Sequence, residues 1–271
     1  MHHATGTDQE THRIYPASRR TGGDAVSSAE ILAEEVPVAL VYNGISHSVM
    51  LATPADLEDF AIGFSLSECI VGRAGEVLDL EIIEGGSGIE VQMQITAERA
   101  QALKRHRRSL AGRTGCGLCG TESLDQLARR SARVESSTVL AEGAVARALS
   151  GLQASQALFR ATGAVHAAAW CEADGRIELL REDVGRHNAL DKMVGALARR
   201  GQRFDGGFVL MTSRASYEIV QKAAAAGIAV VAAVSAPTGM AVRVAVESGV
   251  TLIGFARGER QCVYSHPQRI H

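Results

Sequence analysis

Apolar and polar positions along the first third of the chain predict a small α+β unit. Residues 36–42 and 46–52 are β-rich runs on either side of Asn43-Gly44, a dipeptide typical of a type I′ hairpin turn. Thr53-Pro54 supplies an N-cap and a first-turn proline for a helix whose apolar residues form a one-sided stripe as far as Ile70. Two more strand-like runs and a helix follow, at residues 77–83, 89–95 and 97–108. We expect residues 31–110 to form an N-terminal α+β portion.

The second half of the chain has a different rhythm, in which unbroken apolar runs alternate with helical segments. Strands are predicted at residues 165–171, 177–180, 207–212, 228–234 and 250–255. Helices are predicted at residues 143–159, 186–200, 217–226 and 239–248. Strands that are apolar throughout need cover on both faces, so residues 126–271 are expected to form a layered α/β sandwich. Residues 31–271 can equally form one continuous unit.

The N-terminal segment and the overall composition narrow the class of protein. Residues 1–30 are rich in His, Thr, Ser, Gly and Arg without periodicity, and we expect them to form a mobile tail that carries no chemistry. They contain no apolar core of a secretory signal, and no apolar run reaches the roughly 18 to 20 residues of a membrane span, so a cytoplasmic protein without membrane contact is expected. With 28 Lys and Arg against 30 Asp and Glu, the net charge of −2 argues against a nucleic-acid binder.

Residues 111–125 form a glycine-rich loop around the pair Cys116 and Cys119. Glycines at positions 112, 115, 117 and 120 leave both thiols accessible, and Arg105, Arg107, Arg108 and Arg113 favour the thiolate. Nucleophilic or sulfur-transfer chemistry is the prediction. Three alternatives are a redox dithiol, a zinc site and a purely packed cysteine loop. Zinc needs four ligands and only two stand together here, so no structural metal is expected.

A charged strip over residues 181–192 stands where a strand is predicted to turn into a helix. Asp183, Arg186 and His187 could hold a phosphate, a ribose or a partner's backbone at the mouth of the sheet. An equal alternative is a capped helix start, with Lys192 and Arg199 on a solvated face. His166 lies inside an apolar strand and reads as a core histidine.

A second candidate for ligand binding follows the last predicted strand. It is the segment Phe255-Ala256-Arg257-Gly258-Glu259-Arg260. Two arginines around a glycine at the carboxyl end of a strand could hold a pyrophosphate or a guanine, with Glu259 accepting from a base edge. The alternative is a charged exit loop without a ligand.

Four motifs together resemble the FdhD family of formate dehydrogenase accessory proteins. They are Gly115-Cys116-Gly117-Leu118-Cys119-Gly120, the strip at residues 182–192, Ser213-Arg214-Ala215-Ser216-Tyr217-Glu218, and the loop at residues 254–258. The resemblance implies a sulfurtransferase of the sulfur-carrier type. Such a protein accepts sulfur from a cysteine desulfurase and passes it to the bis-molybdopterin guanine dinucleotide form of the molybdenum cofactor before insertion into formate dehydrogenase. A cytidine-deaminase-like α/β fold and a homodimer are also implied.

Carried over by position, the resemblance assigns roles to a few residues. Cys116 would carry the persulfide, with Cys119 as its neighbour, and residues 255–260 would bind the cofactor. Ala164 departs from the family, which tends to have a second glycine there. A zinc deaminase, the rival suggested by this fold, needs His-x-Glu followed by Pro-Cys-x-x-Cys, whereas here Cys116 precedes His187 and position 189 is Ala. A cofactor-binding chaperone without sulfur chemistry, or a dithiol redox protein, stays open as an alternative.

Overall fold

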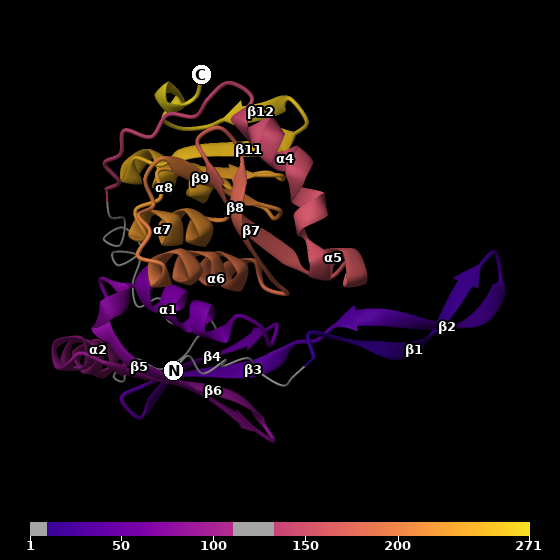
Figure 1. Cartoon of the computed structure of the whole chain (residues 1–271), viewed down its shortest axis with the longest axis horizontal. Helices are drawn as coiled ribbons and strands as arrows, with labels where there is room; N and C mark the ends of the chain where they lie inside the picture. Colours follow the sequence, from indigo (N-terminus) through magenta and orange to yellow (C-terminus); the bar gives the residue numbers. More distant parts are fainter. Residues whose placement is uncertain (1–9, 111–132) are drawn as a thin grey trace.

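The computed structural model describes residues 10–110 and 133–271. A four-stranded sheet in the order β4-β3-β6-β5 forms the N-terminal portion (Figure 1). Its strands are β3 (Val36–Tyr42), β4 (Ile45–Ala52), β5 (Val77–Gly85) and β6 (Gly88–Ile95). Asn43 and Gly44 both have positive φ, as the predicted type I′ turn requires. The helices that accompany this sheet are α1 (Leu57–Ser67), the short η1 (Ala74–Glu76) and α2 (Ala97–Leu110).

A six-stranded mixed sheet in the order β12-β11-β10-β9-β7-β8 forms the larger portion. Its strands are β7 (His166–Glu172), β8 (Ile177–Asp183), β9 (Gly207–Met211), β10 (Val230–Ala233), β11 (Thr251–Arg257) and β12 (Arg260–Val263). Strands β9, β10 and β11 are parallel, and the remaining pairs are antiparallel. Every residue of β9 and β10 is buried, which fits strands covered on both faces.

Helices cover both faces of this sheet (Figure 1). On one face lie α4 (Ala144–Ser155) and α5 (Ala157–Thr162), and on the other α6 (Arg186–Arg199), α7 (Tyr217–Ala225) and α8 (Gly239–Ser248). The chain ends in the short helix η2 (Pro267–Arg269). The expected α/β class, a layered sandwich with a smaller N-terminal α+β portion, is confirmed. The helix predicted as one stretch over residues 143–159 is broken at Gln156, which has non-helical φ and ψ.

The two portions are packed against each other through helices α1 and α6. At this crossing Gly63 lies against the Asp191 backbone and Gly195 against the Asp59 backbone, so closely that a Cβ on either glycine would overlap a carbonyl oxygen. Arg181 donates to the Asp59 carboxylate at 2.8 Å in the same contact. The close approach joins the two portions over a continuous interface.

A buried ion pair of the larger portion also binds the N-terminal portion through Thr53. The Lys192 ammonium lies 2.6 Å from the Asp183 carboxylate, and both side chains are fully buried. Lys192 also donates to the Thr53 carbonyl at 3.0 Å, and Asp183 accepts from the Thr53 amide at 3.0 Å. The alternative of a capped helix start placed Lys192 on a solvated face. That part of it is wrong, because Lys192 is buried. These contacts tie Thr53 to the larger portion, and α1 begins at Leu57, with Asp56 at the N-cap, rather than at the predicted cap Thr53.

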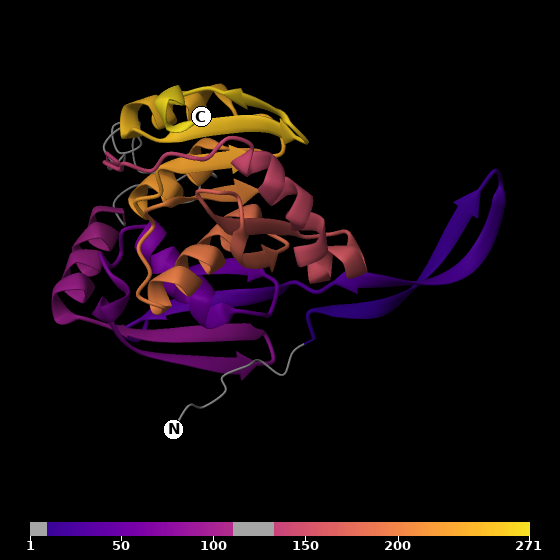
Figure 2. The same ribbon diagram turned by 45° about the horizontal axis from the view of Figure 1, so that its top comes forward.

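The N-terminal segment forms a β-hairpin arm, which we define as β1 (His12–Thr21) paired with β2 (Asp24–Ala33). Figures 1 and 2 show the arm extending away from the rest of the chain. The prediction of a mobile tail over residues 1–30 is thus wrong for residues 12–30. Gly22 and Gly23 both have positive φ and close the two-residue turn, but the flanking strands are too polar to show an apolar period.

Candidate functional site

Five strands of the larger sheet meet at one edge, which we call the carboxyl edge. The parallel strands β9, β10 and β11 all end there. Strand β8 ends and β7 begins at the same edge, because His166 is paired with Asp183 and Ala168 with Met211. Open α/β sheets bind ligands at the edge where their parallel strands end. A ligand site is therefore expected at the carboxyl edge.

The segment at residues 255–260 lies at this edge as a hairpin rather than as an exit loop. Strand β11 continues to Arg257, the turn is at Gly258 and Glu259, and β12 begins at Arg260. A bulge interrupts the register between Gly254 and Arg257. Phe255 has a φ of 51° in this bulge and is 46% exposed, whereas Ala256 is fully buried. Bulges commonly re-aim side chains next to functional sites.

Both arginines of this hairpin are available to a ligand. Arg257 and Arg260 are paired across the hairpin and exposed. Neither guanidinium has a hydrogen bond or ion pair with any residue in the described part of the chain. Glu259 is exposed between them. An unpaired arginine fork is suited to phosphate, which it can bind through two parallel hydrogen bonds.

The charged strip at residues 181–192 contains buried residues that stabilise the fold and other residues that face the carboxyl edge. Asp183 accepts from the Gly185 amide at 2.8 Å and from the Asn188 amide group at 2.9 Å, besides its pair with Lys192. These bonds satisfy the start of α6, so Asp183 is a buried structural residue. Arg186, at the first position of α6, has a buried Nε without a hydrogen-bond partner in the described part of the chain. It remains a candidate for an anion.

His187 contacts α7 at the same edge. Its Nε2 lies 3.3 Å from the Ser216 hydroxyl and 3.0 Å from the Glu218 carboxylate. Burial lowers the pKa of His187 to about 4, although the negative charge of Glu218 opposes the shift. The imidazole is therefore neutral near pH 7. Both contacts involve the same nitrogen, so this is not a Ser-His-Glu triad, in which the two ring nitrogens serve different partners.

A cavity of about 630 Å³ opens at the carboxyl edge between the sheet and helices α4 and α5. Sequence reasoning treated His166 as a core histidine, but it is half-buried and lines this cavity. Burial and the nearby charge of Arg186 both lower the pKa of His166. Gln156 and Phe159 were not singled out in the sequence. The sequence predicted one continuous helix over residues 143–159 and so gave no signal for either residue.

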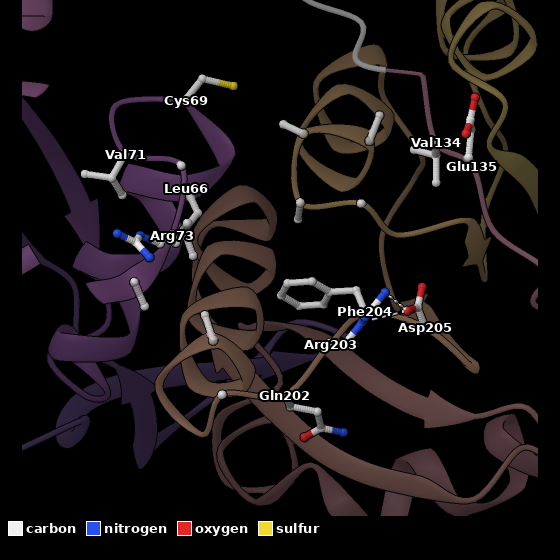
Figure 3. A pocket seen from close by; sticks show the side chains of 18 of the residues that line it. Leu66, Cys69, Val71, Arg73, Val134, Glu135, Gln202, Arg203, Phe204 and Asp205 are labelled. Carbon is white, nitrogen blue, oxygen red and sulfur yellow. Dashed lines mark hydrogen bonds and ion pairs between the residues drawn. The ribbon is translucent and has the colours of Figure 1, made fainter. Parts of the chain in front are cut away.

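A second cavity, of about 700 Å³, lies at the opposite edge, where α6 and α7 end. We call it the amino-edge cavity (Figure 3). Figure 3 shows the Phe204 ring pointing into it, with Cys69 and Glu135 on opposite sides. Two of its arginines are already paired, Arg99 with Glu76 at 2.8 Å and Arg203 with Asp205 at 2.8 Å.

The catalytic candidates Cys116 and Cys119 lie outside the described residues. Of the three described cysteines, Cys69 and Cys262 are exposed and Cys171 is buried. Burial raises the pKa of Cys171 to about 12, so this thiol is unreactive. Over residues 10–110 and 133–271, no three His, Cys, Asp or Glu side chains gather into a metal site, and no helix is long and apolar enough to cross a bilayer.

The carboxyl edge combines unpaired arginines with an adjoining cavity and so defines an α/β protein with a site suited to a small anionic ligand. Comparison with known proteins then gives the family. The family model for the FdhD/NarQ family matches residues 33–271. The chain belongs to the FdhD/NarQ family.

Individual relatives cover nearly the whole chain. The sulfur carrier protein FdhD of Cupriavidus necator is 57% identical over 272 residues, covering 100% of this chain and 94% of that protein. The protein of the same name from Bordetella petrii is 54% identical over 246 residues, covering 91% of this chain and 88% of its own. The crystal structure of a putative formate dehydrogenase accessory protein from Desulfotalea psychrophila superposes with a TM-score of 0.77. It is 23% identical, covers 97% of this chain and 100% of its own, and supports the fold.

Proposed function

We propose that this chain is a sulfur carrier for formate dehydrogenase maturation in the cytoplasm. It accepts sulfur from a cysteine desulfurase as a persulfide on Cys116. It then passes the sulfur to the bis-molybdopterin guanine dinucleotide form of the molybdenum cofactor before the cofactor is inserted into formate dehydrogenase. The observation that carries this proposal is the 57% identity, over the whole chain, with a protein named for sulfur carriage.

The proposed chemistry needs only the two cysteines of the loop. The Cys116 thiolate attacks the outer sulfur of the desulfurase persulfide, an S–S bond forms on Cys116, and the donor cysteine leaves as a thiolate. Releasing that sulfur as sulfide requires two electrons. Cys119 can supply them by attacking the inner sulfur of the Cys116 persulfide, which expels hydrosulfide and closes a disulfide between the two cysteines.

The cofactor is the substrate in this proposal, and the carboxyl edge is its proposed binding site. The unpaired guanidiniums of Arg257 and Arg260 suit the diphosphate of a guanine dinucleotide, and the unpartnered Nε of Arg186 offers a third donor at the same edge. The start of α6 adds the positive end of a helix dipole. Phe255 and the backbone of the hairpin at residues 255–260 complete the proposed contact.

Mass measurement of the intact chain tests sulfur loading. The full chain is incubated with a cysteine desulfurase and cysteine and analysed without reductant. We expect the mass of one sulfur atom to be added to the wild type and to Cys262→Ser, a control that replaces an exposed cysteine outside the loop. Cys116→Ser should gain none. Undiminished loading of Cys116→Ser would contradict the assignment, and a wild type that binds nucleotide without ever loading sulfur would favour the chaperone alternative.

We also propose a homodimer in which the β-hairpin arm contacts a second copy of the chain. The arm exposes Ile14 and Ile31, which are cross-strand partners, on one face, and Val26 and Leu32 on the other. An isolated two-stranded hairpin is only marginally stable in water, so a covered arm is favoured. Light scattering should give twice the 28.6 kDa chain mass for the wild type and for the control Val246→Glu on α8. Ile14→Glu with Ile31→Glu should shift the chain toward the monomer. An unchanged dimer mass would place the interface elsewhere.

A further inference from the structure

The amino-edge cavity has no part in the proposed cofactor site, although its volume of about 700 Å³ lies in the range of ligand-binding sites. Much of its lining is apolar. Val71 and Val134 are buried, and Leu66 and Phe204 are partly buried and pack against the core. The Phe204 ring packs edge to face on Trp170, with 6.0 Å between the ring centroids, and points into the cavity (Figure 3). An aromatic ring that is held in place at an open apolar wall is a typical anchor of protein–protein contacts.

Two arginines of the cavity lack a carboxylate partner. Arg73 and Arg133 are exposed, and neither has a hydrogen bond or ion pair with a described residue. The other two arginines of the lining are each paired with a carboxylate of the chain. Glu135 is the one lining carboxylate without a partner among the described residues. The unpaired charges of the lining are therefore net positive, and they suit a ligand that carries carboxylates.

Helix α7 ends at the cavity, and its last carbonyls remain open. The carbonyls of Ala225 and Ala226, which line the cavity, accept no hydrogen bond from a described residue. The last carbonyls of a helix need N–H donors and carry the negative end of the helix dipole. A polypeptide supplies backbone N–H groups together with carboxylate side chains, whereas the phosphates of a nucleotide supply acceptors. The cavity therefore suits a polypeptide better than a nucleotide.

The cavity lies beside both ends of the described chain around the cysteine segment. Helix α2, which contributes Arg99 to the lining, is the last described element before residue 111, and Arg133 is the first described residue after the segment. Arg133 is held at the end of α8, because the Val134 amide donates to the Ser248 carbonyl at 2.8 Å. A protein bound in the cavity therefore contacts the chain on both sides of the segment that carries Cys116, and it leaves the carboxyl edge open to the cofactor.

We propose that the amino-edge cavity is the docking site of the sulfur donor. It binds a polypeptide segment of the cysteine desulfurase, in which an apolar side chain enters beside Phe204 and carboxylates on either side of it pair with Arg73 and Arg133. Backbone N–H groups of that segment meet the open carbonyls of α7. This site rests on the proposed function, which supplies the donor, and it adds the surface that receives the donor. Donor and cofactor then bind at opposite edges of the sheet and can be held by the chain at the same time.

Calorimetric titration of the full chain with the purified desulfurase tests the site without requiring sulfur transfer. Replacing both Arg73 and Arg133 by Glu turns two attractions into repulsions and should weaken binding by about 10-fold or more. Ala225→Trp fills the cavity from a half-buried position on α7 and should weaken binding by a similar factor without altering any charge. The matched control reverses two exposed arginines outside the cavity, Arg176→Glu with Arg243→Glu, and should bind as the wild type does.

Sulfur loading of Cys116 gives a second measurement. Both cavity variants should load slowly from the desulfurase but at the wild-type rate from inorganic polysulfide, which needs no docking surface. Wild-type affinity of both variants for the desulfurase would overturn the site, and so would a loss confined to the binding of formate dehydrogenase or an equal loss in the control. The proposed function fails separately, if neither donor adds sulfur to Cys116 of the wild type.

Discussion

The two cavities lie at opposite edges of the same sheet and differ in how their charges are satisfied. In the amino-edge cavity, Arg99 and Arg203 are each paired with a carboxylate of the chain itself. At the carboxyl edge, Arg257 and Arg260 have no partner in the described part of the chain, and the buried Nε of Arg186 has none there either. Cavity volume does not indicate which of the two is the ligand site, because the amino-edge cavity is slightly larger than the cavity at the carboxyl edge. Arg73 and Arg133 of the amino-edge cavity also lack an ion pair with a described residue, so the contrast rests on the paired Arg99 and Arg203.

Helix direction adds to this difference. Helices α6 and α7 begin at the carboxyl edge and end beside the amino-edge cavity. Their positive dipole ends therefore face the edge with Arg257 and Arg260, and their negative ends face the amino-edge cavity, where Arg99 and Arg203 are paired. Both contributions favour an anion at the carboxyl edge.

The largest expected effect concerns the buried pair that supports the carboxyl edge. Lys192→Met leaves the Asp183 carboxylate buried and unpaired, which should lower the free energy of unfolding by about 3 to 5 kcal/mol. Arg203→Met, which breaks an exposed pair at the amino-edge cavity, is the control and should change stability little. Urea unfolding measures both. Similar losses in the two variants would contradict the structural role given to Asp183 and Lys192.

Nucleotide affinity should depend on arginines at one edge only. Replacing both Arg257 and Arg260 by Ala should weaken GDP binding by about 100-fold or more, because each charge-assisted contact contributes roughly 1.5 to 3 kcal/mol. Arg73→Ala at the amino-edge cavity is the matched control and should leave the affinity unchanged. The comparison fails if Arg73→Ala weakens GDP binding and the double variant does not.

Acid should destabilise the chain partly through His187. Its pKa is about 4 in the folded chain and about 6.5 when unfolded, so the unfolded chain binds more protons between these values. Stability from this group is complete above pH 6.5 and is lost as the pH falls toward 4, by up to about 3 kcal/mol. The groups around it are Arg186, Glu218, Lys222 and Glu68. His187→Gln should flatten the stability profile between pH 6.5 and 4; parallel profiles would argue against a buried neutral imidazole.

The smallest expected effect comes from a helix cap at the carboxyl edge, where a loss of stability can be separated from a loss of nucleotide binding. Thr238 caps α8 by accepting from the Ala241 amide at 3.2 Å. Thr238→Ala should lower the free energy of unfolding by about 1 kcal/mol and leave GDP affinity unchanged. A loss of affinity comparable with that of the arginine variant would mean that the edge responds to any local loosening rather than to specific contacts.

Local sequence patterns predicted the elements of this fold well where burial is strong. The apolar runs of β9 and β10 and the Asn43-Gly44 turn were each predictable, because a two-sided burial or a positive φ restricts residue choice. The arm was missed because its exposed strands have no apolar period. The start of α1 was misplaced because Thr53 is held by Asp183 and Lys192, which are more than a hundred residues away.

The candidate site was predictable only in part. The segment at residues 255–260 stands out by its arginines, although its hairpin geometry depends on pairing with β12. The buried roles of Asp183 and Lys192 could not be read from a strip in which both look like surface charges. Gln156 and Phe159 line a cavity at the carboxyl edge because α4 and α5 pack beside strand ends that are distant in sequence.

Hydrogen exchange of the full chain, with and without saturating GDP, tests most directly whether the carboxyl edge is the ligand site. We predict slower exchange in peptides that cover residues 156–166 and 253–263, and no change in residues 198–205 beside the amino-edge cavity. Protection confined to residues 198–205, with none at the carboxyl edge, would contradict the account.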